Sequence, residues 1–167
     1  KVSDATINLT KKFSIQNLTG EINNKKNNGF ALVIKKGSLF NLELAGTTIN
    51  LVREVNNIKM KGLLHTNGKL SYIEIKKISS LFGLNINFFK DINGNADLRT
   101  NINFDLDNKF RIKNLSYSSE GNIYSMELYT EEKRMIRKYF PLYDSKIILK
   151  DTKIKLTKSK SYQIVKL

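Results

Sequence analysis

Hydrophobic and polar residues alternate with a period of two along most of the chain. The longest run spans residues 98–106, where apolar Leu98, Ile102 and Phe104 are at even-numbered positions and charged Arg99 and Asp105 are at odd-numbered ones. Shorter runs of the same kind occur at 7–15, 40–45, 58–60, 70–72 and 153–157. Successive side chains of a β-strand point to opposite faces of the sheet, so each run predicts a strand with one apolar and one polar face.

Short polar dipeptides separate these runs and predict tight turns. They are Lys11-Lys12, Lys36-Gly37, Asn67-Gly68 and Asp107-Asn108. Asn-Gly is the strongest hairpin signal among them, because a type I′ turn needs positive φ at both central residues. Strands joined so tightly pair with antiparallel neighbours, and roughly ten strands at intervals of about 8–12 residues are typical of a meander, sandwich or barrel.

Two segments break the alternation and have helical spacing. In the first, 75–82, Ile75, Ile78 and Leu81 share one side and Gly83 follows as a helix end. In the second, Thr130 can cap a helix that Pro141 stops. We therefore expect an all-β fold: a curved, elongated antiparallel sheet, taco-like or a sandwich-like meander, with two short helices near 75–83 and 131–140.

Composition adds a strong positive charge whose meaning is limited. Lys and Arg number 29 against 15 Asp and Glu, giving a net charge of +14, but 24 of the 29 are lysines spread over nearly every predicted strand. Lys, Asn and Ile, all abundant here, are the residues of A+T-rich codons. A basic β-domain that binds nucleic acid is the alternative function, ranked second because the lysines form no compact patch.

Candidate catalytic chemistry is sparse. The absence of Cys excludes disulfides, thiolate metal clusters and thiol catalysis. The single histidine, His65, has no Gly-x-Ser-x-Gly motif to accompany it. Residues 91–97 begin like a calcium loop, but Gly94 is fourth and Ile102 twelfth, so we expect a polar turn there. We expect no enzyme activity, no metal and no cofactor.

Paired carboxylates leave a third possibility, a carbohydrate-active or other β-rich enzyme. Asp105 and Asp107 form one close pair, and Glu131 and Glu132 form another. A hairpin turn and a helix start explain these pairs equally well. We therefore rank an enzyme third, below nucleic-acid binding and below the non-enzymatic function that the resemblance described below implies.

Both ends of the sequence indicate a piece of something longer. The chain starts at Lys1, and its last residues, 161–167, alternate like a strand without a stop. The chain has no run of about 18 apolar residues, the length that a bilayer-spanning helix needs. We expect 1–167 to be a single segment of a longer β-rich repeat protein.

Four segments resemble the AsmA-like superfamily of bacterial envelope proteins, in particular the AsmA-like repeats of its large YhdP-type members. They are Leu42-Glu43-Leu44-Ala45-Gly46-Thr47-Thr48-Ile49, residues 60–70, residues 112–121, and the junction at 135–143. The resemblance extends over roughly 40–157 and rests on a pattern of strands. It implies a long sheet folded lengthwise around an apolar groove, in a periplasmic protein anchored to the inner membrane through a region outside this segment.

The same resemblance implies a role in phospholipid transport between the inner and outer membranes, or in envelope scaffolding, with acyl chains and both membranes as partners. An apolar groove suits this role, since each sheltered methylene is worth about 0.8 kcal/mol. Alternation fits a closed sandwich core equally well, and that alternative stays open. The lipid-groove candidates are Phe40, Leu42, Leu44, Met60, Ile102, Phe104, Ile112, Met126, Leu128, Ile154 and Leu156.

Overall fold

The computed structural model describes residues 1–10, 13–25, 28–81, 86–87, 89–109, 111–130, 138–139, 141–142, 144–159 and 163–166. They form ten strands and the helix α1. Their bounds are β1 Val2–Thr10, β2 Phe13–Lys25, β3 Gly29–Leu39, β4 Leu42–Glu43, β5 Thr48–Arg53, β6 Asn57–Ser71, α1 Tyr72–Leu81, β7 Phe89–Asp107, β8 Ile112–Thr130, β9 Lys146–Lys158 and β10 Gln163–Lys166.

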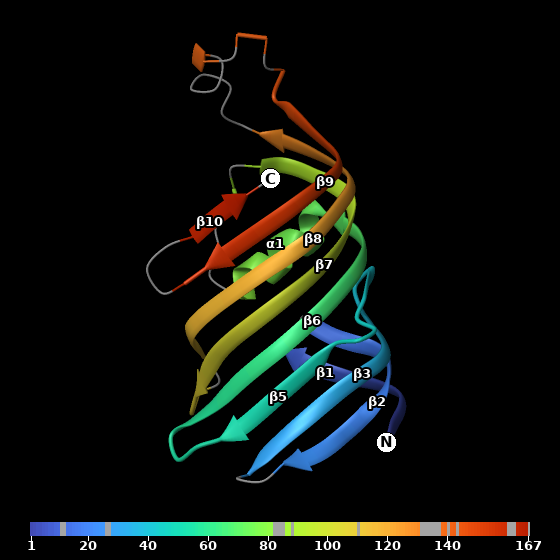
Figure 1. The fold of residues 1–167 in the computed structure, drawn as a ribbon, viewed down its shortest axis with the longest axis vertical. Helices are drawn as coiled ribbons and strands as arrows, with labels where there is room; N and C mark the ends of the chain where they lie inside the picture. The colour runs from blue at the N-terminus through green and yellow to red at the C-terminus, as the bar shows by residue number, and fades with distance from the viewer. Residues whose placement is uncertain are drawn as a thin grey trace.

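All ten strands belong to one antiparallel sheet, which confirms the all-β prediction. The order is β1-β2-β3-β4-β6-β7-β8-β9-β10, and β5 lies between β3 and β6 beside the short β4. The sheet is strongly twisted and curved, with long diagonal strands at its centre and α1 inside the curve, behind β7 and β8 (Figure 1). The sheet thus has a concave face, which carries α1, and a convex face.

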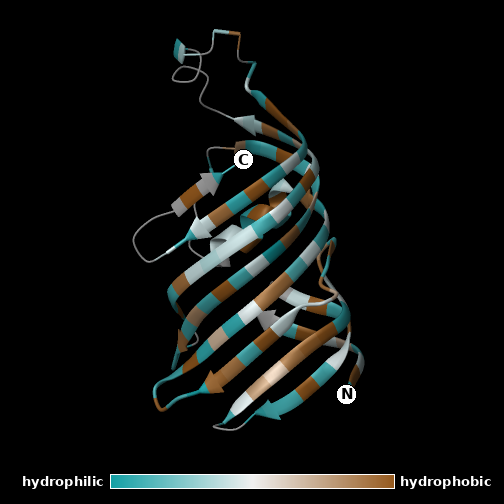
Figure 2. Cartoon of the chain, viewed as in Figure 1, coloured by the Kyte–Doolittle hydropathy of each residue, from teal (hydrophilic) through white to brown (hydrophobic). Residues whose placement is uncertain are grey.

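Alternating polarity assigns the apolar side chains to the concave face. Figure 2 shows hydrophilic and hydrophobic bands alternating along the central strands. Near the N-terminus, a buried cluster of Ile15, Leu18, Ile34 and Leu44 packs against side chains of β1. A second buried cluster, Ile92, Ala96, Ile123 and Met126, packs against Tyr72 and Ile75 of α1. The curled first strands and the helix therefore cover two separate parts of the same face.

The helix expected near 75–83 is present, and it begins three residues earlier than the apolar spacing indicates. Ser71 and Glu74 form a capping box: Ser71 Oγ accepts a hydrogen bond from the Glu74 backbone N–H at 3.4 Å, and Glu74 Oε2 accepts one from the Ser71 N–H at 3.1 Å. The side chain of Asn41 donates to Glu74 Oε1 at 2.8 Å. This network sets the start of α1 at Tyr72. Residues 82–83 lie outside the described part.

The second expected helix, near 131–140, lies outside the described residues apart from Lys138 and Tyr139, which are helical and exposed. The turn predicted at Asp107-Asn108 is confirmed, since β7 ends at Asp107. Lys11-Lys12 is not described, although Thr10 and Phe13 on either side are paired.

Three predicted turns are wrong, because the strands run straight through them. Asn67-Gly68 lies inside β6, Lys36-Gly37 inside β3, and the polar segment 91–97 inside β7. At Gly68 a Cβ would collide with the carbonyl oxygen of Asn41, which directly precedes β4, the strand paired with this part of β6. This glycine permits close approach of two strands, a use that the local sequence does not distinguish from a hairpin turn.

Candidate functional site

Apolar side chains form continuous rows across the concave face. Phe30 of β3 lies opposite Leu51 of β5, Leu51 opposite Met60 of β6, and Met60 opposite Phe104 of β7. Residues directly opposite each other in a sheet share a face, so these four side chains make one row. The neighbouring rows are Leu32–Ile49–Gly62–Ile102–Tyr117 on one side and Ile58–Leu106–Ile112 on the other.

The rows continue toward α1 along the same face. The successive register partners are Leu98–Gly121–Ile154, Gly68–Ala96–Ile123, Leu70–Gly94–Met126–Leu149 and Ile92–Leu128–Ile147. Hydroxyl side chains interrupt them: Thr100 Oγ1 donates a hydrogen bond to Ser119 Oγ at 2.8 Å, Thr66 Oγ1 donates to the Leu98 carbonyl oxygen at 3.4 Å, and Thr152 Oγ1 donates to the Lys150 carbonyl oxygen at 3.0 Å. Each of these threonine hydroxyls has an acceptor, and the rows around them are apolar.

The structure brings most of the predicted groove residues together. Leu42, Leu44, Ile102, Phe104 and Met126 are buried. Met60, Ile112, Leu128, Ile154 and Leu156 are half-buried, and their register partners place them on the concave face. Phe40 is the exception: it lies in the turn between β3 and β4 with φ 55°, and the Lys77 ammonium sits 5.3 Å from its ring centre.

Several residues of the face were missing from the predicted set. Ile22, Phe30, Leu51, Ile58 and Leu106 belong to the same rows. Alternation within residues 30–34 and 49–51 was the signal that could have found Phe30 and Leu51, and Ile58 and Leu106 lie in the alternating runs 58–60 and 98–106. They extend the candidate groove to the end of the sheet far from α1.

The concave face is covered in some places and open in others. Ile102 is only 4% exposed, whereas Phe30 is 48% and Ile22 51% exposed. A hollow of about 330 Å³ lies at the end where Phe30 is exposed, lined by Arg53, Glu54, Val55, Asn57, Ile58, Leu106, Asp107 and Asn108. The face is thus neither a closed sandwich core nor a fully open trough.

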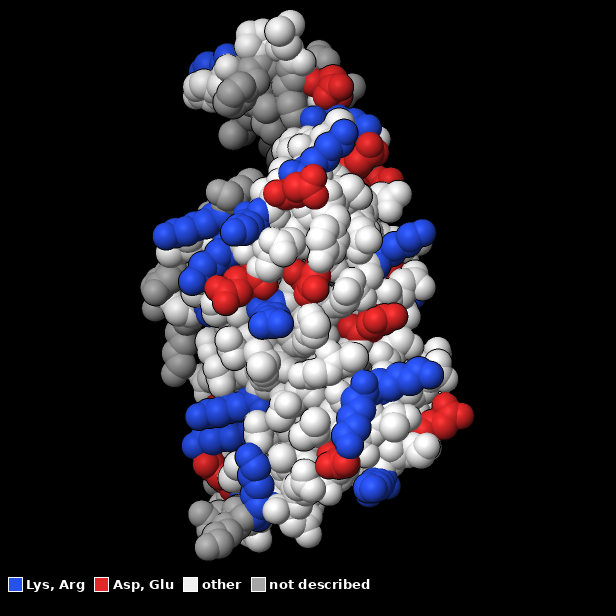
Figure 3. All heavy atoms as spheres, turned by 45° about the vertical axis from the view of Figure 1, so that its right-hand side comes forward, with Lys and Arg blue, Asp and Glu red and all other residues white. Residues whose placement is uncertain are grey.

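Charged side chains occupy the convex face, where lysines and carboxylates are interspersed (Figure 3). Lys146 pairs with Glu127 at 2.8 Å, and Lys35 pairs with Glu21 at 2.6 Å. The hydrogen bond from Lys146 lowers the pKa of Glu127, and that from Lys35 lowers the pKa of Glu21. These pairs offset part of the positive charge, and the intermixing matches the dispersed lysine pattern of the sequence.

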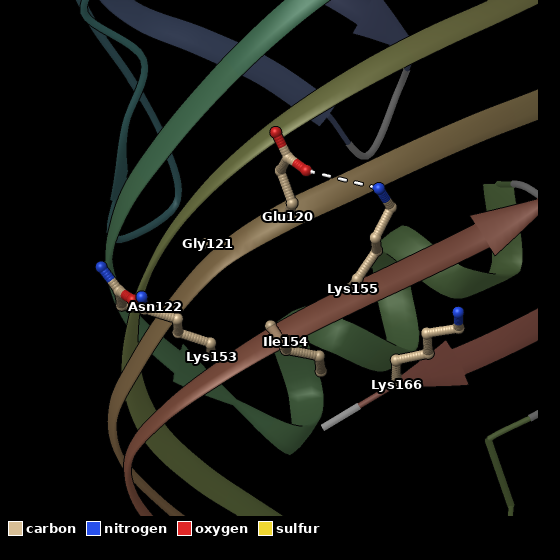
Figure 4. A pocket seen from close by; sticks show the side chains of 7 residues that line it. All are labelled: Glu120, Gly121, Asn122, Lys153, Ile154, Lys155 and Lys166. Atoms are coloured by element: carbon tan, nitrogen blue, oxygen red, sulfur yellow. Dashed lines mark ion pairs between the residues drawn. The ribbon is translucent and has the colours of Figure 1, made fainter.

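A second hollow, of about 410 Å³, lies over β8, β9 and the end of β10 (Figure 4). Its lining includes the lysines 153, 155 and 166. Lys155 reaches toward Glu120, 3.7 Å away, while Lys153 extends toward Asn122 and Lys166 points away from both. The three ammonium groups diverge, so they do not converge on one bound anion.

His65 makes contacts that suit a structural role. Its Nδ1 lies 3.0 Å from the Ala45 carbonyl oxygen and its Nε2 lies 2.9 Å from Asp97 Oδ1. Both ring nitrogens are therefore engaged in joining the loop before β5 to β7. Across the described ranges, no three His, Asp or Glu side chains are grouped so as to hold a metal ion.

No protein-family model, curated protein or solved structure matches this chain. Within the described ranges, no helix has the length and hydrophobicity required to cross a bilayer. Among the features described above, the concave face is the one with an extended apolar lining.

Proposed function

We propose that this chain is a non-enzymatic, lipid-sheltering segment of a bacterial envelope protein of the AsmA-like kind. Its concave face holds phospholipid acyl chains during transport between the inner and outer membranes, in the periplasm. The ligand class follows from the lining, because an extended apolar face without convergent polar groups suits a hydrocarbon chain and offers nothing to a sugar or a nucleotide.

The observation that carries the proposal is the row from Phe30 through Leu51 and Met60 to Phe104. Four strands about 4.8 Å apart give this row a width of roughly 14 Å. Rows on both sides make the apolar surface continuous in the other direction. An acyl chain that shelters eight methylenes here would gain about 6 kcal/mol from the hydrophobic effect. That is enough to hold a lipid without a cofactor or a covalent step.

Partial exposure of the face supports binding over simple core packing. A side chain that only fills a core is expected to be buried, whereas Phe30 and Ile22 remain about half exposed on the lining face. Exposed neighbouring apolar side chains usually mark a surface that another apolar group covers. Ile22 pairs with Leu32 in the row next to that of Phe30, so an acyl chain lying across the two rows would cover both.

Mass spectrometry of lipids extracted from the purified protein tests the proposal. We expect phospholipid to co-purify with the wild type and to be lost from Phe30→Glu, which places a charge on the lining face. Phe30 is already 48% exposed, so this variant is expected to fold.

Leu63→Glu is the matched control. Leu63 is 43% exposed and lies on the opposite face of the sheet, across from Asn101. This variant should retain the wild-type amount of lipid. A lipid-free wild type, or equal lipid loss in both variants, would contradict the proposal.

A further inference from the structure

Three hairpin turns lie next to one another at the open end of the concave face. The Arg53 backbone N–H donates to the Asn28 carbonyl oxygen at 3.3 Å, which joins the β2–β3 turn to the end of β5. Asn57 lies opposite Asp107, which joins the β5–β6 turn to the β7–β8 turn. We call their described residues, 25, 28–29, 53–57, 107–109 and 111, the turn rim.

The turn rim combines an isolated apolar side chain with surplus positive charge. Val55 is 97% exposed at the tip of the β5–β6 turn. Four cations, Lys25, Arg53, Lys109 and Arg111, accompany two carboxylates, Glu54 and Asp107.

Both rim carboxylates are already paired. Glu54 lies 2.6 Å from Lys59, and Asp107 lies 2.7 Å from Arg111. In the part of the chain that the structure describes, Arg53 and Lys109 have no ion-pair partner. Their charges therefore remain available to an external anion.

Hydrogen bonds to Asp107 hold the two basic residues of the β7–β8 turn, Lys109 and Arg111, next to the end of β7. Asp107 Oδ1 accepts hydrogen bonds from the backbone N–H groups of Lys109 at 2.9 Å and Arg111 at 3.0 Å. The Arg111 side chain donates to Asp107 Oδ2 at 2.7 Å. The backbone N–H groups on both sides of the turn that carries Lys109 are therefore hydrogen-bonded to Asp107, the last residue of β7.

The rim also borders the apolar interior. The hollow at this end is lined both by rim residues, among them Arg53 and Val55, and by Ile58 and Leu106 of the concave face. A hydrocarbon chain that moves between a bilayer and the concave face has a direct path between these residues.

We propose that the turn rim docks onto the surface of an anionic phospholipid bilayer. Val55 enters the boundary between headgroups and acyl chains, while Arg53 and Lys109 contact anionic headgroups. Basic residues near an anionic bilayer attract it electrostatically, and a buried apolar side chain adds hydrophobic anchoring. The functional meaning of this docking, lipid entry or exit at the rim, rests on the proposed function; the docking itself does not.

Flotation of the whole chain with vesicles tests the rim. The vesicles contain phosphatidylcholine alone or phosphatidylcholine with one quarter phosphatidylglycerol, at low and high salt. We expect salt-sensitive binding to the anionic vesicles, because screening shortens the reach of surface charge. Arg53→Glu/Lys109→Glu should weaken this binding about 25-fold or more, since each cation lost costs about fivefold. Val55→Asp should weaken it at either salt concentration.

Lys150→Glu/Lys153→Glu is the matched control, with the same change in net charge on β9. It should reduce binding less than about threefold. Equal losses of binding in the two double variants would overturn the proposal. Wild-type binding by both rim variants would also overturn it. Circular dichroism confirms that each variant is folded. If the protein docks through the rim but never carries lipid, the docking proposal is supported and the proposed lipid-binding function is contradicted. If it carries lipid but does not dock, the lipid-binding function is supported and the docking proposal is contradicted.

Discussion

Met60 of β6 and Phe104 of β7 lie directly opposite each other, and both side chains point to the concave face. Phe104 is buried and Met60 half-buried. We expect Phe104→Ala to lower the free energy of unfolding by about 3–5 kcal/mol and Met60→Ala by somewhat less than about 2 kcal/mol, because partial exposure reduces its loss. Since the two residues are opposed, the double variant should cost less than the sum, as measured by urea unfolding. Asn103→Ala, on the other face beside Phe104, should change stability by no more than about 0.5 kcal/mol.

Gly121 permits β7 and β8 to approach closely. A Cβ at this position would collide with the carbonyl oxygen of Asp97 on β7. We expect Gly121→Ala to destabilise the protein by about 3 kcal/mol or more, because backbone on both strands has to move. Gly37→Ala is the comparison, since its Cβ would meet only side-chain carbons at 3.4 Å or more. It should stay within about 1 kcal/mol of wild type in urea unfolding; similar losses in both variants would refute the role of Gly121.

The capping box sets the start of α1. Removing the hydroxyl in Ser71→Ala leaves the Glu74 backbone N–H without its side-chain acceptor and should cost about 1 kcal/mol. Ser80→Ala removes the hydrogen bond that the Ser80 hydroxyl donates to the Lys77 carbonyl oxygen. This carbonyl lies within the helix and accepts a backbone hydrogen bond there, so the variant should change stability by less than about 0.5 kcal/mol. Thermal unfolding followed by circular dichroism compares the two. A larger effect at Ser80 would mean that the cap does not define the helix start.

Tyr117 makes stability depend on alkaline pH. It lies on the concave face opposite Ile102, and burial raises the pKa of its phenol above the ordinary value of 10.0. The folded state therefore holds this proton more tightly than the unfolded state. Its contribution to stability is fully present below pH 10 and is lost as the pH rises through the folded-state pKa. Urea unfolding between pH 8 and 11 should show a shallower decline for Tyr117→Phe than for wild type.

The matched variant for this titration is Tyr124→Phe, at a position on the same strand that is 44% exposed. It should leave the pH dependence of wild type unchanged. If Tyr124→Phe flattens the alkaline decline as much as Tyr117→Phe does, burial of Tyr117 is not the cause.

Alternation predicted the strands because it reflects a local property, the two faces of a single strand. It was enough to place Met60, Ile102 and Phe104 on one face together. It could not decide how that face is covered, since the curl of β1 over Ile34 and the docking of α1 over Ile92 depend on contacts between distant segments. Phe40 shows the opposite failure: it continues the alternation of Leu42 in sequence yet lies in a turn.

Glycines misled the sequence interpretation for a related reason. Asn67-Gly68 has the composition of a hairpin turn, and only the close approach of the Asn41 backbone, just before β4, explains why glycine is needed inside β6. The capping box, in contrast, was readable, because Ser71 and Glu74 have the Ser-x-x-Glu spacing. This spacing alone places the start of α1 at Tyr72.

The order of the strands has a consequence for how the protein reaches its fold. Most strands pair with a strand next to them in sequence, and the step from β6 to β7 crosses the helix α1. Loops that close over few residues cost little entropy, and local pairing favours rapid folding. The sheet can therefore assemble hairpin by hairpin while the polypeptide emerges from the ribosome. Each newly made strand can then pair with the strand that precedes it, so an unpaired strand edge is exposed only until the next strand is made.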